Sequence, residues 1–478
     1  MPISFVGNKL IIPTSSPWVQ FEKWAQIYGP IFTLWIGRRP TIIISDPNVA
    51  VDLLENGSTK YSSRPRFVVM GELYWDNAGI LVQPYGKEWQ VRRRMLHQAL
   101  NRSALRLYKP IQEAEATRLC EALLDEPSYY EGIVDRFTAR SFFVETVPWL
   151  KHFPNFLAPW KAEIQRRGRE EASANMELLL RVQNELRDAK SPSDIPESLT
   201  KLLIQAREAD QTTFGGLSDR DFSFVPASLF GAGSDTTAST LCSAILMLVT
   251  NPRVQAIAHA ELDHIIGAER MPTFEDEPDL PYLKALCYET LRIRPVAVLG
   301  GTPHANSVAD TYEGYFIPKG TTILSNSWAI NLNSKYYPTP NHFNPEWFLS
   351  VDHKTLSYLP EPSTEELTEI SPPRMHPAKE GHSSFGWGRR ICPGAGLAHN
   401  SLFIALARLL WAFEIKPVRE ADGSERKYDT FAYTQGFNIR PRPFECEIDV
   451  RVEGRRQVLK AEMKNAESVM SRFAPFQD

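Results

Sequence analysis

Apolar residues recur every three to four positions through most of residues 86–250, which is the spacing of one face of an α-helix. The pattern is clearest in EALLDE (121–126) and in AEIQRRGREEASANMELLLRVQNEL (162–186). A further apolar helical run, AHNSLFIALARLLWAFEI, covers residues 398–415. Because helices pack mainly against helices or against a sheet, this much helical sequence predicts a mainly α fold.

Shorter β-rich segments accompany the helical part. Residues 31–55 begin with two β-rich runs separated by GRRP, which predicts a hairpin followed by a helix that Asp46 and Pro47 start. Other β-rich pieces occupy 311–325 and 430–450, and the Pro-rich polar stretch 350–382 is expected to be a loop. The sequence therefore predicts one large unit, mainly α with a smaller β region, over residues 1–450. The charged residues 451–478 are expected to form a helical tail outside the core.

Charge and cysteine content exclude several classes of protein. The 53 basic and 57 acidic residues nearly balance, so nothing in the charge asks for nucleic acid as a partner. Five cysteines without a CxxC pair argue against the usual zinc sites and against a disulfide-stapled secreted protein. The N-terminus has neither a basic segment nor a long apolar stretch, so we expect no signal peptide and no membrane span. An intracellular, reduced protein is the expectation.

One cysteine lies in an unusual setting. Cys392 occurs in FGWGRRICPG (385–394), among glycines and next to two arginines, directly before the apolar helical run. Positive charge, backbone N–H groups and a helix N-terminus all lower the pKa of a thiol, and glycines let the backbone approach a flat or bulky group. These features are typical of a thiolate that ligates a metal. A buried structural cysteine, or a nucleophile assisted by His382 or His399, is compatible with the same residues.

A second unusual segment interrupts a long apolar helical stretch. FGAGSDTTAST (230–240) places two glycines and an Asp-Thr-Thr run in mid-helix, where Gly costs roughly 1 kcal/mol relative to Ala and Thr or Asp side chains compete for backbone hydrogen bonds. A helix with a weakened turn and an acid beside an alcohol indicates a small-molecule pocket with proton delivery. A helix that is merely kinked is the alternative.

Two further pairs carry little information alone. Glu289 and Arg292 in YETLR are three residues apart on one helix face, a common surface arrangement. Trp89 and Arg93 in GKEWQVRRR are four apart and together offer a ring N–H and a guanidinium suited to carboxylates. A solvated basic face is the simpler interpretation of the second pair.

Taken together, the four segments resemble the cytochrome P-450 haem-thiolate monooxygenases, and most closely fungal members that act in natural-product or xenobiotic oxidation. The family pattern F-x-x-G-x-R-x-C-x-G is matched over 385–394, A/G-G-x-D/E-T-T/S over 232–237, E-x-x-R over 289–292 and W-x-x-x-R over 89–93. All four occur in the family's order, and the similarity extends from about residue 7 to about residue 447. The resemblance implies the family's fold, an α-helical haem domain with a small β-sheet subdomain.

The resemblance also implies ligands for a haem b group. Cys392 would be the thiolate ligand of the iron, the arrangement that favours O–O cleavage. The propionates would be held by Trp89, Arg93 and Arg390, with His304 as a further contact.

Other roles implied by the resemblance concern protons and the scaffold. Asp235 and Thr236 would relay protons to iron-bound dioxygen, and Gly233 would leave room for the oxygen. Glu289 and Arg292 would be structural. Substrate would be lined by 67–82, 296–302 and 431–437.

The implied activity is insertion of one oxygen atom from O2 into a small apolar organic substrate, with electrons from NADPH through a reductase. A haem-binding pseudoenzyme, or a reductase-independent haem-thiolate isomerase or peroxygenase, is the alternative. We expect the protein in the cytoplasm or at the surface of the endoplasmic reticulum, without a spanning segment.

Three departures from the family pattern stand out. The chain begins where such proteins usually have the end of a membrane anchor and hinge. We therefore expect either a soluble protein or an incomplete N-terminus. Trp347 in PEWF replaces the arginine that normally joins Glu289 and Arg292, and Arg389 is a candidate to replace it. The distance from Trp89 to Thr236 is a few dozen residues shorter than expected, with the loss near 137–153, whereas 350–382 is longer than usual.

Overall fold

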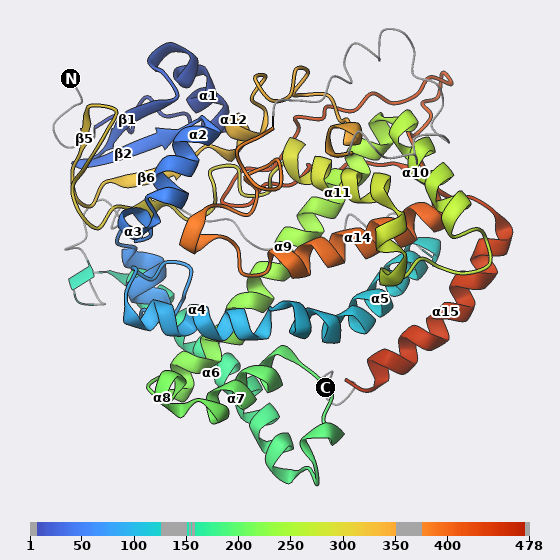
Figure 1. Cartoon of the computed structure of the whole chain (residues 1–478), viewed down its shortest axis with the longest axis horizontal. Coiled ribbons are helices and arrows are strands. Elements are labelled where there is room, and N and C mark those ends of the chain that lie inside the picture. The colour runs from blue at the N-terminus through green and yellow to red at the C-terminus, as the bar shows by residue number, and fades with distance from the viewer. Residues whose placement is uncertain (1–6, 126–150, 153, 155–157, 350–374, 474–478) are drawn as a thin grey trace.

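The computed structural model describes residues 7–125, 151, 152, 154, 158–349 and 375–473. Helices make up most of the molecule, and the principal sheet lies at one side, at the upper left of Figure 1. The predicted fold class, mainly α with a smaller β region, is confirmed.

Four strands form the principal sheet, in the order β1-β2-β6-β3. β1 (Ile31–Ile36) and β2 (Arg39–Ile44) make the predicted antiparallel hairpin, and β2 pairs in parallel with β6 (Thr322–Ser325). β3 (His304–Ala305) completes the sheet antiparallel to β6. Two smaller antiparallel pairs are β4 (Asp310–Tyr312) with β5 (Tyr315–Ile317) and β7 (Phe413–Lys416) with β8 (Glu447–Val450).

The helix predicted after the hairpin is present. α2 (Pro47–Ala50) begins at Pro47, and the Asp46 carboxylate accepts hydrogen bonds from the backbone N–H groups of Asn48 and Val49. A short polar side chain before a proline at the first helical position is a favoured start for a helix, because it satisfies donors that have no partner within the helix.

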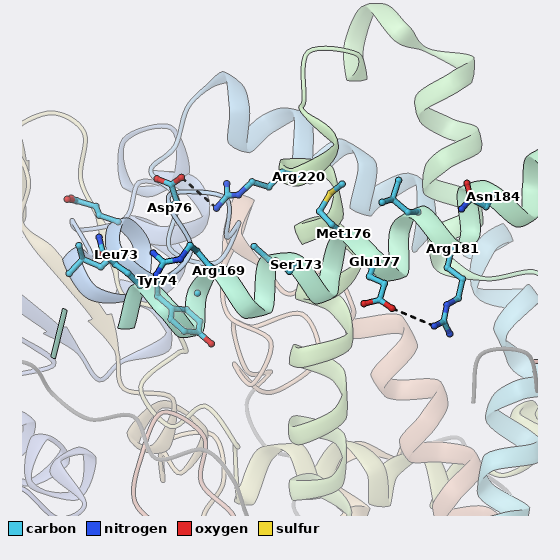
Figure 2. Close-up of a pocket in the computed structure, with 15 residues that line it drawn as sticks. Leu73, Tyr74, Asp76, Arg169, Ser173, Met176, Glu177, Arg181, Asn184 and Arg220 are labelled. Atoms are coloured by element: carbon cyan, nitrogen blue, oxygen red, sulfur yellow. Dashed lines mark ion pairs between the residues drawn. The ribbon is translucent and has the colours of Figure 1, made fainter. Parts of the chain in front are cut away.

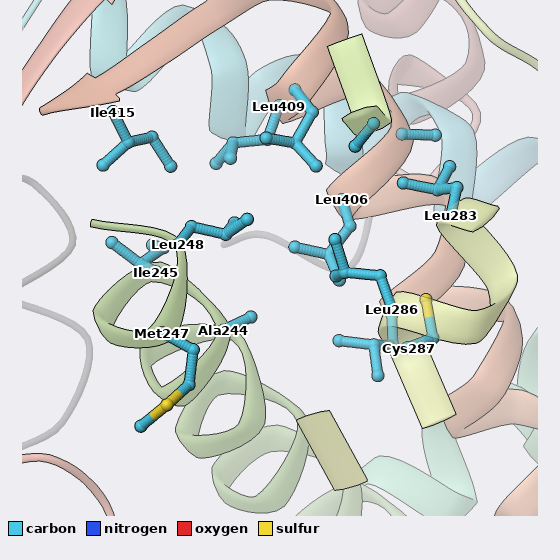
Figure 3. Close-up of a cluster of buried hydrophobic side chains, with 14 of the residues drawn as sticks. Ala244, Ile245, Met247, Leu248, Leu283, Leu286, Cys287, Leu406, Leu409 and Ile415 are labelled. Carbon is cyan, nitrogen blue, oxygen red and sulfur yellow. The ribbon is translucent and has the colours of Figure 1, made fainter. Parts of the chain in front are cut away.

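The main hydrophobic core is built from helices distant in sequence. α9 (Asp219–Thr250) runs through the centre of the molecule, with α11 (Pro281–Ile293) and α14 (Ala395–Ala412) beside it (Figure 1). Figure 3 shows Ala244 and Leu248 of α9 facing the same interior as Leu286 of α11 and Leu406 of α14. The part of α14 that follows Ser401 is buried on all sides, which explains the almost unbroken apolar sequence there.

The remaining helices surround this core. They are α1 (Pro17–Tyr28), α3 (Ser58–Tyr61), α4 (Lys87–Ala99), α5 (Arg102–Asp125), α6 (Pro159–Asp188), α7 (Leu199–Ala209), α8 (Gln211–Phe214), α10 (Pro252–Ile265), α12 (Ser327–Asn331) and α15 (Glu453–Ser471). π-Helical segments η1 (Val51–Asn56) and η2 (Val68–Tyr74) and 3-10 segments η6 (Pro192–Asp194), η7 (Phe274–Asp279), η8 (Pro345–Phe348) and η10 (Gly388–Arg390) complete the set among the described residues.

The segment expected as a charged C-terminal tail is a helix that packs on the rest of the protein. α15 lies against α5, and Leu459 joins the main core while Met463 and Ala466 are buried with Ala114 of α5. Arg455 is also buried and donates a hydrogen bond to the carbonyl oxygen of Trp411 (2.6 Å). The residues from Glu453 to Ser471 therefore belong to the packed body of the protein.

Two sequence expectations fall largely outside the described residues. The shortened region 137–153 is described only at 151 and 152, and the long stretch 350–382 only from 375 onward. Residues 375–382 contain no helix or strand, in agreement with the predicted loop.

Membrane-spanning character is weak in the described part of the chain. By length and composition α14 passes as a candidate span, and so do α9 and α10 together as a pair bent by 105°. However, 61% of the α14 candidate window is buried inside the protein, as expected for a core helix.

Candidate functional site

The cysteine loop, residues 385–394, is held in shape by its own backbone hydrogen bonds. The N–H of Cys392 donates to the carbonyl oxygen of Phe385 (2.8 Å), and the N–H of Ile391 donates to that of Gly388 (3.1 Å). Gly388 has φ of 54°, and a Cβ there would collide with the Leu54 carbonyl oxygen, so the tight packing of this loop requires glycine. α14 begins three residues after Cys392. The loop leaves the cysteine exposed, unlike Cys120, Cys242 and Cys287.

The sequence predicted a lowered pKa for Cys392, and this prediction is wrong, because the pKa is raised by burial. A hydrogen bond from the Gly394 backbone and the positive charge of Arg93 both lower the pKa of the thiol. Burial by the surrounding protein outweighs them, so the pKa of Cys392 is above its usual value. The cysteine residue borders solvent, yet the protein packed around its sulfur disfavours the charged thiolate.

The two candidate histidine bases are engaged with an acid. His399 Nε2 lies 3.1 Å from Glu380 Oε2, and the fully buried His382 lies 3.9 Å from the same atom. Within the described residues, neither imidazole has a hydrogen bond to Cys392. The geometry gives no support to a cysteine nucleophile paired with either histidine.

Arg390 and Arg93 flank the cysteine loop, together with Trp89. Arg390 donates to the carbonyl oxygens of Ser62 and Gln83 (both 2.7 Å), and its guanidinium lies 4.1 Å from the centre of the Trp89 ring. Arg93 donates to the carbonyl oxygen of Ile391 (2.6 Å). α4 thus places Trp89 and Arg93, which are four residues apart on the helix, next to the cysteine loop.

A third guanidinium, Arg64, joins this group. It is buried, follows α3, and donates to the carbonyl oxygens of Thr302 (2.8 Å) and Pro303 (3.1 Å). Arg64 was not among the residues that the sequence predicted to contact the cofactor. Apart from the proline that follows it, no local pattern marks Arg64, because the carbonyl groups that hold it lie 238 and 239 positions away in sequence.

These arginines form a positive cluster with which no acid of the described residues is paired. Burial and the charges of Arg64 and Arg93 lower the pKa of Arg390 to about 8, and burial lowers the pKa of Arg64 to about 9. Among the described residues, no ion pair involves Arg64, Arg93 or Arg390. Buried positive charges normally have negative partners, so the cluster is suited to an anionic group that the protein chain does not provide.

His304 lies beside the same cluster. Its Nδ1 is 2.8 Å from the carbonyl oxygen of Tyr61, which can only accept, so Nδ1 carries the proton. Burial and the charges of Arg64 and Arg390 lower the pKa of His304 to about 3. The ring is therefore neutral at physiological pH, and Nε2 is an acceptor. His304 Nε2 can donate a hydrogen bond to a carboxylate only after the ring gains a second proton. The contact of His304 with a propionate therefore stays a prediction.

The acid and the alcohol predicted to carry protons lie on α9. The helix is continuous through FGAGSDTTAST, so the predicted weak turn does not break it. The Thr236 hydroxyl donates a hydrogen bond to the Ala232 carbonyl four residues earlier (2.7 Å). Residues 231–234 are exposed, and a Cβ on Gly233 would have no neighbour within 4 Å. The Asp235 carboxylate accepts a hydrogen bond from Asn438 Nδ2 (2.7 Å) and lies 3.5 Å from Arg440 Nη1.

Glu289 and Arg292 form a fully buried ion pair. Two parallel contacts of 2.6 Å join the guanidinium to the carboxylate, and neither side chain is exposed to solvent. Trp347 lies over this pair, with its ring centre 4.6 Å from the Arg292 guanidinium. Arg389 is not the replacement for the missing arginine, because it is exposed and donates to the Tyr85 hydroxyl (2.5 Å). An aromatic ring occupies the place of the third charge.

Two cavities are evident. One, of 490 Å³, adjoins the cysteine loop and is lined by Tyr85, Trp89, Gln90, Arg93, Arg94, Gly388 and Arg389. A larger one, of 1010 Å³, lies between η2, α6 and the start of α9, and Figure 2 shows Tyr74, Arg169 and Arg220 around it. The larger cavity contains none of the predicted catalytic or cofactor-binding residues, so size alone does not identify the site.

A family model described as Cytochrome P-450 matches this chain in two overlapping parts, residues 1–143 and 125–446. The junction of the two matches falls where the sequence predicts missing residues. It lies mostly in residues that the structure does not describe.

Relatives with similar sequences come from fungi. Cytochrome P-450 monooxygenase 58 of Postia placenta is 33% identical over 502 aligned positions, which cover 97% of this chain and 90% of the relative. A cytochrome P-450 monooxygenase of Armillaria gallica is 30% identical, covering 96% and 91%. The first alignment is longer than the 478 residues of this chain, so the chain has gaps relative to it.

Solved structures show a similar fold. A zebra fish cytochrome P-450 with abiraterone has a TM-score of 0.69 at 24% identity, covering 92% of this chain and 99% of that one. A second structure of a zebra fish cytochrome P-450, with progesterone, has a TM-score of 0.68.

Proposed function

The chain belongs to the cytochrome P-450 family, and from this premise we propose that it is a haem-thiolate monooxygenase that inserts one oxygen atom from O2 into a small apolar organic substrate. The observation that carries the proposal is the exposed Cys392 beside three guanidiniums that have no acid among the described residues. A thiol ligand and a cluster suited to anions are both required to hold a haem with two propionates.

The residues fit this cofactor. The family implies haem, which when bound supplies the redox chemistry of dioxygen. Cys392 would ligate the iron, and Arg64, Arg93 and Arg390 would hold the propionates with Trp89 packed against Arg390. A propionate would also offset the burial, and the repulsion from Arg64 and Arg93, that lower the pKa of Arg390. On α9, the open space at Gly233 would leave room for a small ligand such as dioxygen.

Proton delivery is assigned to Asp235 and Thr236. Asp235 is partly exposed and can exchange protons with water, and Thr236 lies one residue further along the helix, where its hydroxyl can pass a proton on. This acid–alcohol pair favours oxygen activation over a reductase-independent isomerase or peroxygenase, which has less need of a proton relay.

The buried pair argues against a pseudoenzyme with a damaged core. Trp347 removes one arginine from the family pattern, but Glu289 and Arg292 stay paired and fully buried. The ion pair of α11 is therefore intact despite the substitution at position 347.

Electrons would come from an NADPH-dependent reductase that approaches on the cysteine side. Arg94 and Arg389 line the 490 Å³ cavity beside the cysteine loop, and such exposed positive charges steer an acidic partner in a salt-dependent way. The substrate would be lined by 67–82, 296–302 and 431–437.

We assign the protein to the cytoplasm or to the surface of the endoplasmic reticulum. Large apolar side chains are exposed on the N-terminal residues and α1, including Leu10, Ile11 and Ile27, and on β5 at Phe316. Exposed apolar groups of this kind suit contact with a lipid surface.

The test is a carbon monoxide difference spectrum of the dithionite-reduced purified protein. The expected result is the long-wavelength Soret band typical of thiolate-ligated haem, lost in Cys392→Ala. Arg64→Ala should weaken haem retention, because removing one guanidinium removes an anion contact. A band at the shorter wavelength typical of a lost thiolate, or protein without haem, would contradict the proposal.

A further inference from the structure

The proposed proton donor is bound to a hairpin rather than to its alcohol neighbour. Residues 432–442 fold back on themselves through backbone hydrogen bonds, from the Thr434 N–H to the Arg440 carbonyl and from the Arg442 N–H to the Ala432 carbonyl (both 2.8 Å). From this hairpin Asn438 donates to one oxygen of Asp235 (2.7 Å), and Arg440 lies 3.5 Å from the other. Both carboxylate oxygens therefore have a partner on the hairpin.

Thr236 is bonded elsewhere. Its hydroxyl donates to the Ala232 carbonyl (2.7 Å), and within the described part of the chain no hydrogen bond joins the Asp235 and Thr236 side chains. Proton transfer between two groups requires hydrogen-bond reach, directly or through one water. In this arrangement the described residues provide no direct hydrogen bond between the two side chains.

The hairpin is held at its base and also near its tip, where Gln435 accepts a hydrogen bond from the Ser16 N–H (2.6 Å). Its base is fixed to α9 by a hydrogen bond from the Tyr433 hydroxyl to the Ser243 hydroxyl (3.1 Å), and the Ile439 N–H donates to the Val296 carbonyl (2.9 Å). At the tip, Phe437 is exposed and faces Gly301, where an added Cβ would lie 4.0 Å from the ring. The tip thus borders the predicted substrate region 296–302.

From these contacts we propose that Asn438 and Arg440 are positioning residues that hold Asp235 against the 432–442 hairpin, away from Thr236, and so restrain proton delivery until the hairpin moves. The inference rests on the proposed function, because it assigns a control to the same site. It ties proton supply to the hairpin that borders the substrate region.

The test uses the reduced holoprotein, without reductase or substrate. Dithionite-reduced protein is mixed with oxygenated buffer, and its return to the oxidised spectrum is followed by stopped flow. In this reaction one electron leaves the iron, one proton joins, and O2 leaves as the hydroperoxyl radical, so the rate depends on proton supply. Asn438→Leu and Arg440→Gln should increase the rate by about 10-fold, which is less than the ~10²–10⁴-fold that a positioned proton donor can contribute.

Controls separate positioning from general damage. Arg440→Lys should keep most of the restraint, because it keeps the positive charge. Arg442→Gln should leave the rate unchanged, since Arg442 contacts the Tyr433 carbonyl and not Asp235. The increase should disappear in an Asp235→Ala background, and D2O should slow the released variants more than the parent protein.

A second measurement needs no haem. Melting temperatures of Asp235→Ala, Asn438→Ala and the double variant should be non-additive, because the two side chains are in contact. Additive shifts, an unchanged oxidation rate, or an equal increase in the Asp235→Ala background would overturn the inference. Loss of the thiolate spectrum with non-additive melting would instead contradict the proposed function and leave the contact established.

Discussion

Arg292 shows how one residue tolerates the loss of a charged neighbour. Its five N–H donors reach Glu289 twice and the carbonyl oxygens of Asn331, Pro340 and His342 at 2.8–3.1 Å. The Glu289 carboxylate also accepts from the Asn344 N–H (2.9 Å). A third arginine is therefore not needed to satisfy either partner, and Trp347 contributes apolar contact and a cation–π interaction in its place.

Substitutions at Trp347 test this interpretation. Trp347→Ala should lower the free energy of unfolding by about 3–5 kcal/mol, the usual cost of truncating a buried aromatic. Trp347→Phe should cost much less, because the indole N–H has no hydrogen-bond partner among the described residues and its loss removes no bond. Trp347→Arg should also be destabilising, since it buries a second positive charge beside Arg292. Urea unfolding measures all three, and a stabilising Trp347→Arg would contradict the interpretation.

At the scale of elements, α15 shows what composition conceals. Residues 451–478 are rich in charge, but the apolar residues Leu459, Met463 and Ala466 follow the spacing of one helix face. That face packs on α5, and the charged residues of α15 other than the buried Arg455 occupy the outer face. The sequence reasoning weighted charge over periodicity and so expected a segment outside the core.

Leu459→Ala should therefore destabilise the protein by about 2–5 kcal/mol, the range for a buried leucine. Lys460→Ala is the matched control at the next, exposed position, and should change stability by less than about 0.5 kcal/mol. Thermal and urea unfolding report both variants. Equal effects of the two substitutions would show that α15 does not contribute to the cooperative core.

At the scale of the whole molecule, several buried histidines have a lowered pKa. Burial is the largest cause in each case, and it lowers the pKa of His259 and His376 to about 4 and of His304 and His382 to about 3. Their ordinary pKa is about 6.5. Between these values the unfolded chain binds protons that the folded chain does not, so folding loses stability as the pH falls.

The predicted consequence is a steep acid destabilisation that begins near pH 6.5 and extends to about pH 4 for His259 and His376 and to about pH 3 for the others. Each such histidine adds a slope of about 1.4 kcal/mol per pH unit. Urea midpoints measured from pH 7 to pH 4 test this, and His259→Gln should reduce the slope. Stability that is flat from pH 6.5 to pH 4 would show that these imidazoles are protonated in the folded protein.

Local chemistry and residue spacing were sufficient to predict part of the structure of this protein. The hairpin, its Asp46-capped helix and the mainly α class were predicted because each depends on residues close in sequence. The cysteine loop and the Trp89–Arg93 pair were identified for the same reason, and the family relationship is confirmed. In these cases the backbone preference and the side-chain chemistry both lie within about ten residues.

Contacts between distant segments were decided only by the tertiary structure. Arg64 enters the arginine cluster, Asn438 reaches Asp235 across 203 positions, and burial outweighs Arg93 and the Gly394 N–H in setting the Cys392 pKa. Desolvation and long-range pairing depend on which segments the fold brings together, and spacing along the chain does not record this. The sequence by itself determined the class of fold, the family and the cysteine loop, whereas the packing of α9, the 432–442 hairpin and the arginine cluster determined the electrostatics in which that chemistry must work.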